Sequence, residues 1–230
     1  LQSMNRSAVS RNPSNSELEG VIESYELGYR MQSAVPEVMS LTGESPETLK
    51  KYGIGNGRTD DFGRQCLMAR RFAQAGVRFI ELTHEGWDQH TSLRSRLGRN
   101  CESTDLPIAG LIADLKQRDL LKDTLVVFCG EFGRTPDNGL RGGGKSYGRD
   151  HNAKAMTIWF AGGGTKAGHT IGSTDEIGSE AVECVHHIRD VHVTLLHLLG
   201  LDDNRLTYFH AGRHKQLSQF GGQVIHELLS

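Results

Sequence analysis

The sequence predicts an α/β fold with a mostly parallel sheet. Three apolar runs, residues 77–85, 124–131 and 155–162, have the length and composition of buried strands. The stretch 107–120, between the first two runs, has the apolar spacing of a helix. Strand, helix and strand form a predicted βαβ unit, which requires a parallel sheet whose faces are covered.

A single domain is expected over residues 16–230, after a short lead-in. Residues 1–15 are rich in Ser, Asn and Arg and have no periodicity, so we expect them to be mobile. The apolar side chains that follow line one face of a long helix, which Pro36 closes or kinks.

Two further helices are expected before the first strand. In the stretch 45–53, Ser45 is the predicted N-cap, Pro46 takes the first helical position and Gly53 is the stop. The next helix is expected over residues 60–74, with an apolar face of Phe62, Cys66, Leu67, Ala69 and Phe72.

The C-terminal part of the chain is expected to add two helices. The sequence IRDVHVTLLHLLG, residues 188–200, has helical spacing and ends at a glycine. The last residues, 222–230, predict a short helix.

Composition excludes several classes of protein. The chain has 230 residues, a formal net charge of -2 and scattered Lys and Arg, so a nucleic-acid partner is not expected. Nothing approaches 18 consecutive apolar residues, so no membrane segment is expected. The four cysteines lie far apart without a Cys-x-x-Cys pair, which argues against a zinc ribbon and a disulfide scaffold.

Polar side chains from three separate loops predict a metal site. Ligands gather beyond the carboxyl ends of parallel strands, where two of these loops lie, and Asp88 and His90 share a face because they are two residues apart. Carboxylates with imidazoles suit zinc or manganese, and oxygen-dominated sites suit magnesium or calcium. The candidate ligands of one divalent ion are Asp88, His90, Glu131, Asp150 and His151.

Simpler explanations exist for the same residues. Glu131 and Arg134 could form a structural ion pair within a turn. Asp88 and His90 could cap the following helix, and His151 could be a hydrogen-bond partner of the backbone. A plain salt bridge is the alternative for Asp150.

The motifs GWDQH, GEFGRTP, GRDHN, AGGGTKAG and DVHVTLLHLLGLD resemble a large bacterial family of unknown function, often labelled sulfatase-like (domain of unknown function 1501). The resemblance covers nearly the whole chain from about residue 25. That family is grouped with the alkaline-phosphatase-like superfamily, whose members hydrolyse or transfer phosphate and sulfate esters at a divalent metal centre. The implied fold is a three-layer sandwich with a mostly parallel central sheet, incomplete here at its N-terminus.

The resemblance also implies roles for individual residues. Glu131 stands where the superfamily has a metal-binding Asp, His151 resembles a further metal-binding His, and Asp88 with His90 resemble an upstream pair. Phe132 replaces a second metal-binding His, so one metal is expected rather than two. Arg134 is the expected catalytic residue, because its planar fork matches the oxyanion of a phosphate or sulfate ester.

Three functions therefore stay open. The first is a metal-dependent phosphate or sulfate ester hydrolase whose nucleophile comes from residues outside this chain. The second is a noncatalytic binding or assembly module of the same fold, and the third is a structural domain with ion-paired loops. Because relatives are often exported, the resemblance favours the periplasm, with the cytoplasm as the alternative.

Overall fold

Helices form the N-terminal half of the protein, as the sequence predicts. The computed structural model describes residues 7, 10, 16–137, 139–141 and 146–230, so the predicted lead-in lies almost wholly outside the described residues. The first four helices of this part are α2 (Ser16–Met39), α3 (Pro46–Lys51), α4 (Asp60–Gln74) and α5 (Leu93–Gln117). Among the described residues, no helix is both long enough and apolar enough to span a membrane.

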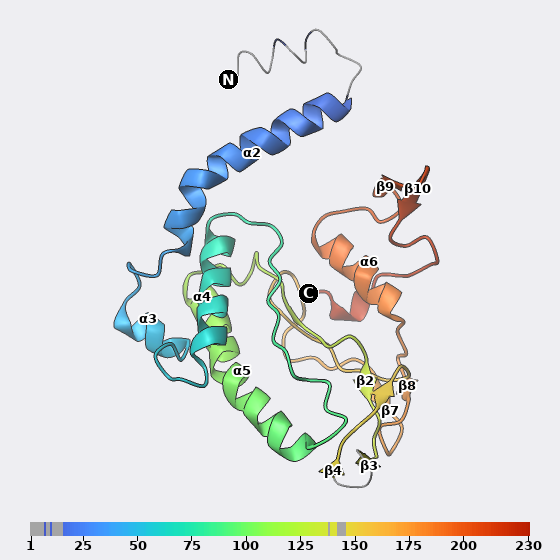
Figure 1. Ribbon diagram of the computed structural model, residues 1–230. Coiled ribbons are helices and arrows are strands. Elements are labelled where there is room, and N and C mark those ends of the chain that lie inside the picture. Colours follow the sequence, from blue (N-terminus) through green and yellow to red (C-terminus); the bar gives the residue numbers. More distant parts are fainter. Residues whose placement is uncertain (1–6, 8–9, 11–15, 138, 142–145) are drawn as a thin grey trace.

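Local sequence signals account for these helix boundaries. The hydroxyl of Ser45 accepts a hydrogen bond from Thr48 N at 3.2 Å, which satisfies a free amide at the start of α3. Gly53 follows α3 with φ of 69°, a conformation that favours glycine. Pro36 lies inside α2 rather than ending it, and the predicted apolar face of α2 includes Tyr25 and Tyr29, which are exposed. Most of α2 projects away from the other helices (Figure 1).

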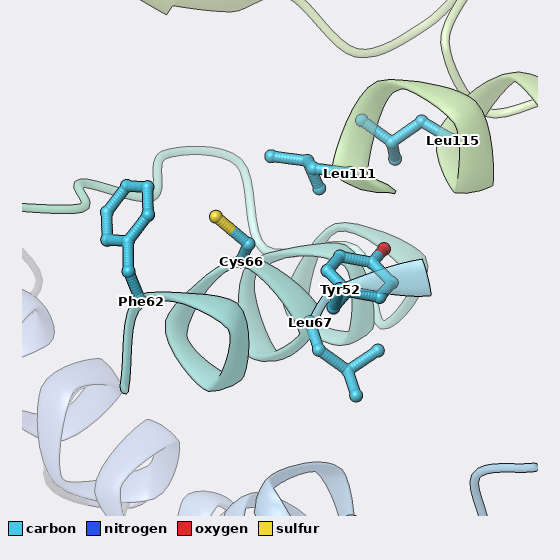
Figure 2. Packing of buried hydrophobic residues seen from close by; sticks show 6 residues of the cluster. All are labelled: Tyr52, Phe62, Cys66, Leu67, Leu111 and Leu115. Atoms are coloured by element: carbon cyan, nitrogen blue, oxygen red, sulfur yellow. The ribbon is translucent and has the colours of Figure 1, made fainter. Parts of the chain in front are cut away.

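The hydrophobic core lies between α3, α4 and α5. Figure 2 shows the side chains of α4 facing those of α5, with a tyrosine from the end of α3 beside them. Of the predicted apolar face of α4, all but the half-buried Phe72 are buried. The core cluster consists of Tyr52, Phe62, Cys66, Leu67, Leu111 and Leu115. Burial raises the pKa of the Cys66 thiol to about 12, so this cysteine stays protonated at neutral pH.

A buried group of charges joins α4 to α5 beside this core. Arg70 lies 2.7 Å from Glu44 and 2.9 Å from Asp114, and each of these three side chains is at most 6% exposed. Tyr52 donates a hydrogen bond to Asp114 at 3.0 Å. Burial raises the pKa of Glu44, but the bonds with Arg70 and Arg71 outweigh this and lower it overall.

The predicted mostly parallel central sheet, and with it the three-layer sandwich, is wrong. In the described residues, every strand pair is antiparallel and each sheet has two strands. The pairs are β1 (Val126–Phe128) with β6 (Trp159–Ala161), β2 (Gly133–Arg134) with β5 (His151–Asn152), β3 (Leu140–Arg141) with β4 (Ser146–Tyr147), β7 (Ser173–Thr174) with β8 (Ala181–Glu183), and β9 (Thr207–His210) with β10 (Arg213–Gln216).

Two features explain this difference. Residues 77–89 form no strand, although burial still alternates along residues 80–85. Leu82 packs against the core, whereas Phe79 is 78% exposed. The predicted βαβ unit therefore lacks its first strand. The chain between β1 and β6 turns back through short strand pairs rather than a crossover helix, so β1 and β6 run antiparallel.

The C-terminal part contains α6 (Ile188–Leu198), the β9–β10 hairpin and a 3₁₀ helix, η1 (His226–Leu228). The predicted helix at 188–200 is confirmed, and the last predicted helix is the single turn η1. His187 caps α6: its side chain accepts from Arg189 N at 3.1 Å, and Asp190 accepts from His187 N at 2.8 Å.

Candidate metal centre

Three of the five predicted metal ligands meet at one point. Asp88 Oδ1 lies 2.9 Å from His90 Nε2 and 3.0 Å from His151 Nε2, and the two Nε2 atoms are 3.2 Å apart. One carboxylate oxygen and two imidazole nitrogens thus form a nearly equilateral triangle. The side chains of Asp88 and His151 are about half exposed, so the triangle opens toward solvent.

A strand pair brings Arg134 and His151 to the same place. They are direct cross-strand partners in the β2–β5 pair, and partners of this kind project to the same side of a sheet. Both side chains contact Asp88 Oδ1. The convergence therefore depends on an antiparallel pair rather than on the edge of a parallel sheet.

The residue between Asp88 and His90, Gln89, anchors their loop to the rest of the protein. Side chains alternate between the two faces of an extended segment, so Gln89 points away from the side of Asp88 and His90. Gln89 is accordingly buried, with 3% exposure. Its carbonyl accepts a hydrogen bond from Arg149 N at 3.1 Å. This bond joins the loop to the segment that leads into β5.

Gly148 permits the close contact between these two segments. A Cβ atom at this position would lie 1.8 Å from the carbonyl oxygen of His90. The sequence placed Gln89 in a loop expected to carry ligands, but it predicted no supporting role for Gln89 or Gly148. Because Asp88 and His90 share one face of GWDQH, the alternation of side chains indicates that Gln89 points the opposite way. No local signal in the sequence shows that Gly148 lies against the backbone of His90.

Arg134 links two of the predicted acidic ligands. It donates from Nη1 to Asp88 Oδ1 at 2.7 Å and from Nη2 to Glu131 Oε1 at 3.3 Å. The hydrogen bond from Arg134, with that from His151, lowers the pKa of Asp88 to about 2, so Asp88 is a carboxylate at neutral pH. Glu131 is not among the three residues whose ligand atoms lie together.

Asp150 and Phe132 contact the two histidines from outside the triangle. Asp150 Oδ1 lies 2.9 Å from Nδ1 of His90, the nitrogen that faces away from Asp88. The Phe132 ring lies 4.1 Å from the His151 ring, centroid to centroid, and the Arg134 guanidinium carbon lies 5.4 Å from the Phe132 centroid. Neither residue adds a ligand atom to the triangle.

The donor set fits a divalent ion. Ligand atoms bound at about 2.0–2.2 Å around a tetrahedral ion are about 3.4 Å apart, slightly more than the sides of this triangle. Two imidazole nitrogens and one carboxylate oxygen are ligands that zinc and manganese accept. A small outward movement of the three side chains would thus admit an ion.

Comparison with known proteins identifies the family. No curated protein and no solved structure matches the chain. The family described as "Protein of unknown function (DUF1501)" matches residues 1–229. The chain therefore belongs to the DUF1501 family.

Proposed function

We propose that the protein is a divalent-metal-dependent hydrolase of phosphate or sulfate esters. The observation that carries the proposal is the triangle formed by Asp88, His90 and His151, with Arg134 bonded to its carboxylate corner. Ligand atoms from distant parts of the sequence lie within 4.8 Å of one another. A guanidinium beside such a set places an oxyanion-binding group next to the metal ligands.

Each side chain has a distinct task in this proposal. Asp88, His90 and His151 hold the ion, which when bound supplies Lewis-acid polarisation of an ester oxygen or of an attacking hydroxyl. Arg134 offers paired N–H donors that match two oxygens of a phosphate or sulfate group. Its bond to the exposed Glu131 is the longer of its two ion pairs, so an incoming oxyanion replaces Glu131 most readily.

The reaction is a displacement at phosphorus or sulfur. In the chain itself, the oxygen of a water molecule forms the new bond to phosphorus or sulfur, so this reaction needs no nucleophilic side chain, and the bond to the ester oxygen breaks. The attacking group loses a proton, and the departing alcohol takes one up. Arg134 stabilises the charge that builds up on the nonbridging oxygens during the transfer.

The resemblance of the sequence motifs to the alkaline-phosphatase-like superfamily supports this reaction class. In that resemblance, Phe132 occupies the position of a second metal-binding His, and here its ring packs against His151. An apolar ring at this position supports one metal ion rather than two. Glu131, which the resemblance puts at a metal-binding Asp, pairs with Arg134 instead.

The same contacts favour a second candidate, a noncatalytic single-metal binding module. Phe132 stands where the resemblance puts a metal-binding His, so one imidazole ligand is missing. The ion pairs of Arg134 with Asp88 and Glu131 already hold the loops together. A module of this kind would bind the ion without turning over an ester.

Metal titration tests both candidates against a structural role for the ion pairs. Isothermal titration of the full chain with Zn²⁺ or Mn²⁺ should show one ion per chain. Asp88→Asn and His151→Ala should abolish binding, whereas Asp105→Asn, which changes an exposed aspartate on α5, should not alter it. The metal proposal is refuted if the wild-type chain binds neither ion.

Turnover separates the hydrolase from the binding module. The metal-loaded chain should hydrolyse 4-nitrophenyl phosphate or 4-nitrophenyl sulfate, and a chelator should remove the activity. Binding of the ion without turnover of either ester would instead favour the noncatalytic module.

A further inference from the structure

The two ring nitrogens of His90 face different groups. Nδ1 lies 2.9 Å from Asp150 Oδ1, and Nε2 faces Asp88 Oδ1 and His151 Nε2 inside the triangle. A neutral imidazole carries one proton, and a carboxylate can only accept a hydrogen bond. A proton held on Nδ1 by Asp150 leaves the lone pair of Nε2 directed into the triangle.

The geometry points to Asp150 as a positioning residue for His90 rather than as a metal ligand. This inference rests on the proposed metal site and assigns a different role from that predicted by the sequence. Asp150 fixes the tautomer and the ring orientation of His90, so that Nε2 is ready to bind a cation. Carboxylates on the outer nitrogen of metal-binding histidines commonly act in this way.

The backbone of Asp150 is fixed on both sides, as a positioning role requires. Asp150 N donates to the Thr135 hydroxyl at 3.1 Å, and Thr135 N donates to Asp150 O at 2.9 Å. These bonds tie Asp150 to the residue after Arg134. The neighbour of Asp150 in the sequence, His151, meets the opposite nitrogen of the same ring. One dipeptide therefore holds His90 from both sides.

The expected effect differs from that of losing a ligand. Removal of a partner outside the ligand shell typically lowers metal affinity about 10–100-fold without changing the number of ions bound. Loss of a ligand such as Asp88 should remove measurable binding. Asp150→Asn keeps the shape of the side chain but removes its charge, and the amide can donate a hydrogen bond as well as accept one. This variant therefore isolates the role of the carboxylate.

Zinc titration of the full-length variants supplies the first readout. For Asp150→Asn we expect one Zn²⁺ per chain and a Kd raised about 10–100-fold. Asp150→Glu should restore part of the affinity, and Asp105→Asn should match the wild type. An unchanged Kd, or a loss of binding as complete as that of Asp88→Asn, would overturn the inference. If Asp150→Asn does not fold, Thr135→Val should raise the Kd in the same direction through loss of the hydroxyl.

The second readout needs no metal and no activity. Asp88 Oδ1 also lies 2.9 Å from His90 Nε2, so the comparison is made in Asp88→Ala, in which Asp150 is the remaining carboxylate bonded to the ring. In two-bond ¹H–¹⁵N spectra of this metal-free variant above pH 8, the His90 ring should carry its proton on Nδ1. When Asp150→Asn is added to Asp88→Ala, this tautomeric preference should disappear. The same tautomer in both variants contradicts the positioning role, even if the wild-type chain binds no Zn²⁺. A failure of the proposed function and a failure of this inference are therefore distinguishable.

Discussion

Asp88 is the residue on which the site depends most. Its Oδ1 atom is within 3.0 Å of Arg134, His90 and His151 at once. These contacts favour the ionised form and account for the low pKa of this carboxyl group, about 2. Without an ion, Arg134 balances the charge of Asp88. With an ion bound, that charge becomes part of the ligand set.

The lowered pKa predicts how Asp88 affects stability at different pH values. A carboxyl of an unfolded chain has a pKa of about 3.9, so the ionised side chain stabilises the fold above about pH 4. This contribution is lost as the pH falls through the folded-state pKa, about 2. The wild type should unfold at a higher midpoint than Asp88→Asn at pH 5, and this difference should shrink below about pH 4. A difference that stays constant to about pH 2 would contradict the stabilising contacts.

Arg134 predicts a selective loss of anion binding. Arg134→Lys keeps the charge but loses the planar pair of donors, so the Kd of inorganic phosphate or sulfate for the metal-loaded chain should rise about tenfold or more. The affinity for Zn²⁺ should change little, because no ligand atom is removed. Equal anion affinity in the variant and the wild type would exclude Arg134 as the oxyanion-binding residue.

At the scale of elements, the β2–β5 pair and the loop 88–90 form the site together. The pair aligns Arg134 with His151, and Gly148 lets the chain before β5 pass directly against the backbone of His90. The site therefore depends on backbone contacts that involve no ligand atom.

Gly148→Ala tests this dependence. The added Cβ would overlap the backbone of His90, so the loop must move and carry the His90 ring with it. We expect Zn²⁺ affinity to fall about 10–100-fold, as for other changes outside the ligand shell. Gly57→Ala is the matched control, because a Cβ there meets no atom within 4 Å. Equal losses in both variants would show that the effect is not local.

The buried charges between α4 and α5 give a second prediction at this scale. Arg70→Met removes the cation that Glu44 and Asp114 share. Each carboxylate keeps one other arginine, Arg71 or Arg118, so the change should cost up to about 3–5 kcal/mol of unfolding free energy. Arg64→Met removes an ion pair of similar length to Asp60 on the exposed side of α4, and should cost at most about 1 kcal/mol. Chemical denaturation measures both. A similar cost in the two variants would argue against the buried network.

For the whole molecule, local signals predicted the helices better than the sheets. Caps and apolar spacing fix the start of α3, the bounds of α4 and the position of α6, and each of these depends on residues close in sequence. Strand pairing depends on distant partners. An apolar run such as 77–85 satisfies the pattern of a strand, yet it packs one side against the helices without joining a ladder.

The candidate site shows the same division between local and distant information. The chemistry of carboxylates and imidazoles singled out Asp88, His90 and His151, whose side chains lie together in the structure, and their role as metal ligands stays a prediction. The expected scaffold, the edge of a parallel sheet, was wrong, because β2 and β5 pair antiparallel. The pair of Glu131 with Arg134 is the local ion pair that the sequence offered as the alternative to a metal ligand. The position of Asp150 behind His90 depends instead on a tertiary contact that no spacing in the sequence encodes.

Anomalous diffraction from crystals of the chain grown with Zn²⁺ or Mn²⁺ tests the central claim most directly. The structure predicts one peak about 2.0–2.2 Å from Asp88 Oδ1, His90 Nε2 and His151 Nε2, with Asp150 still bonded to His90 Nδ1. No peak between these three side chains at saturating metal, or a peak bound elsewhere, would contradict the account.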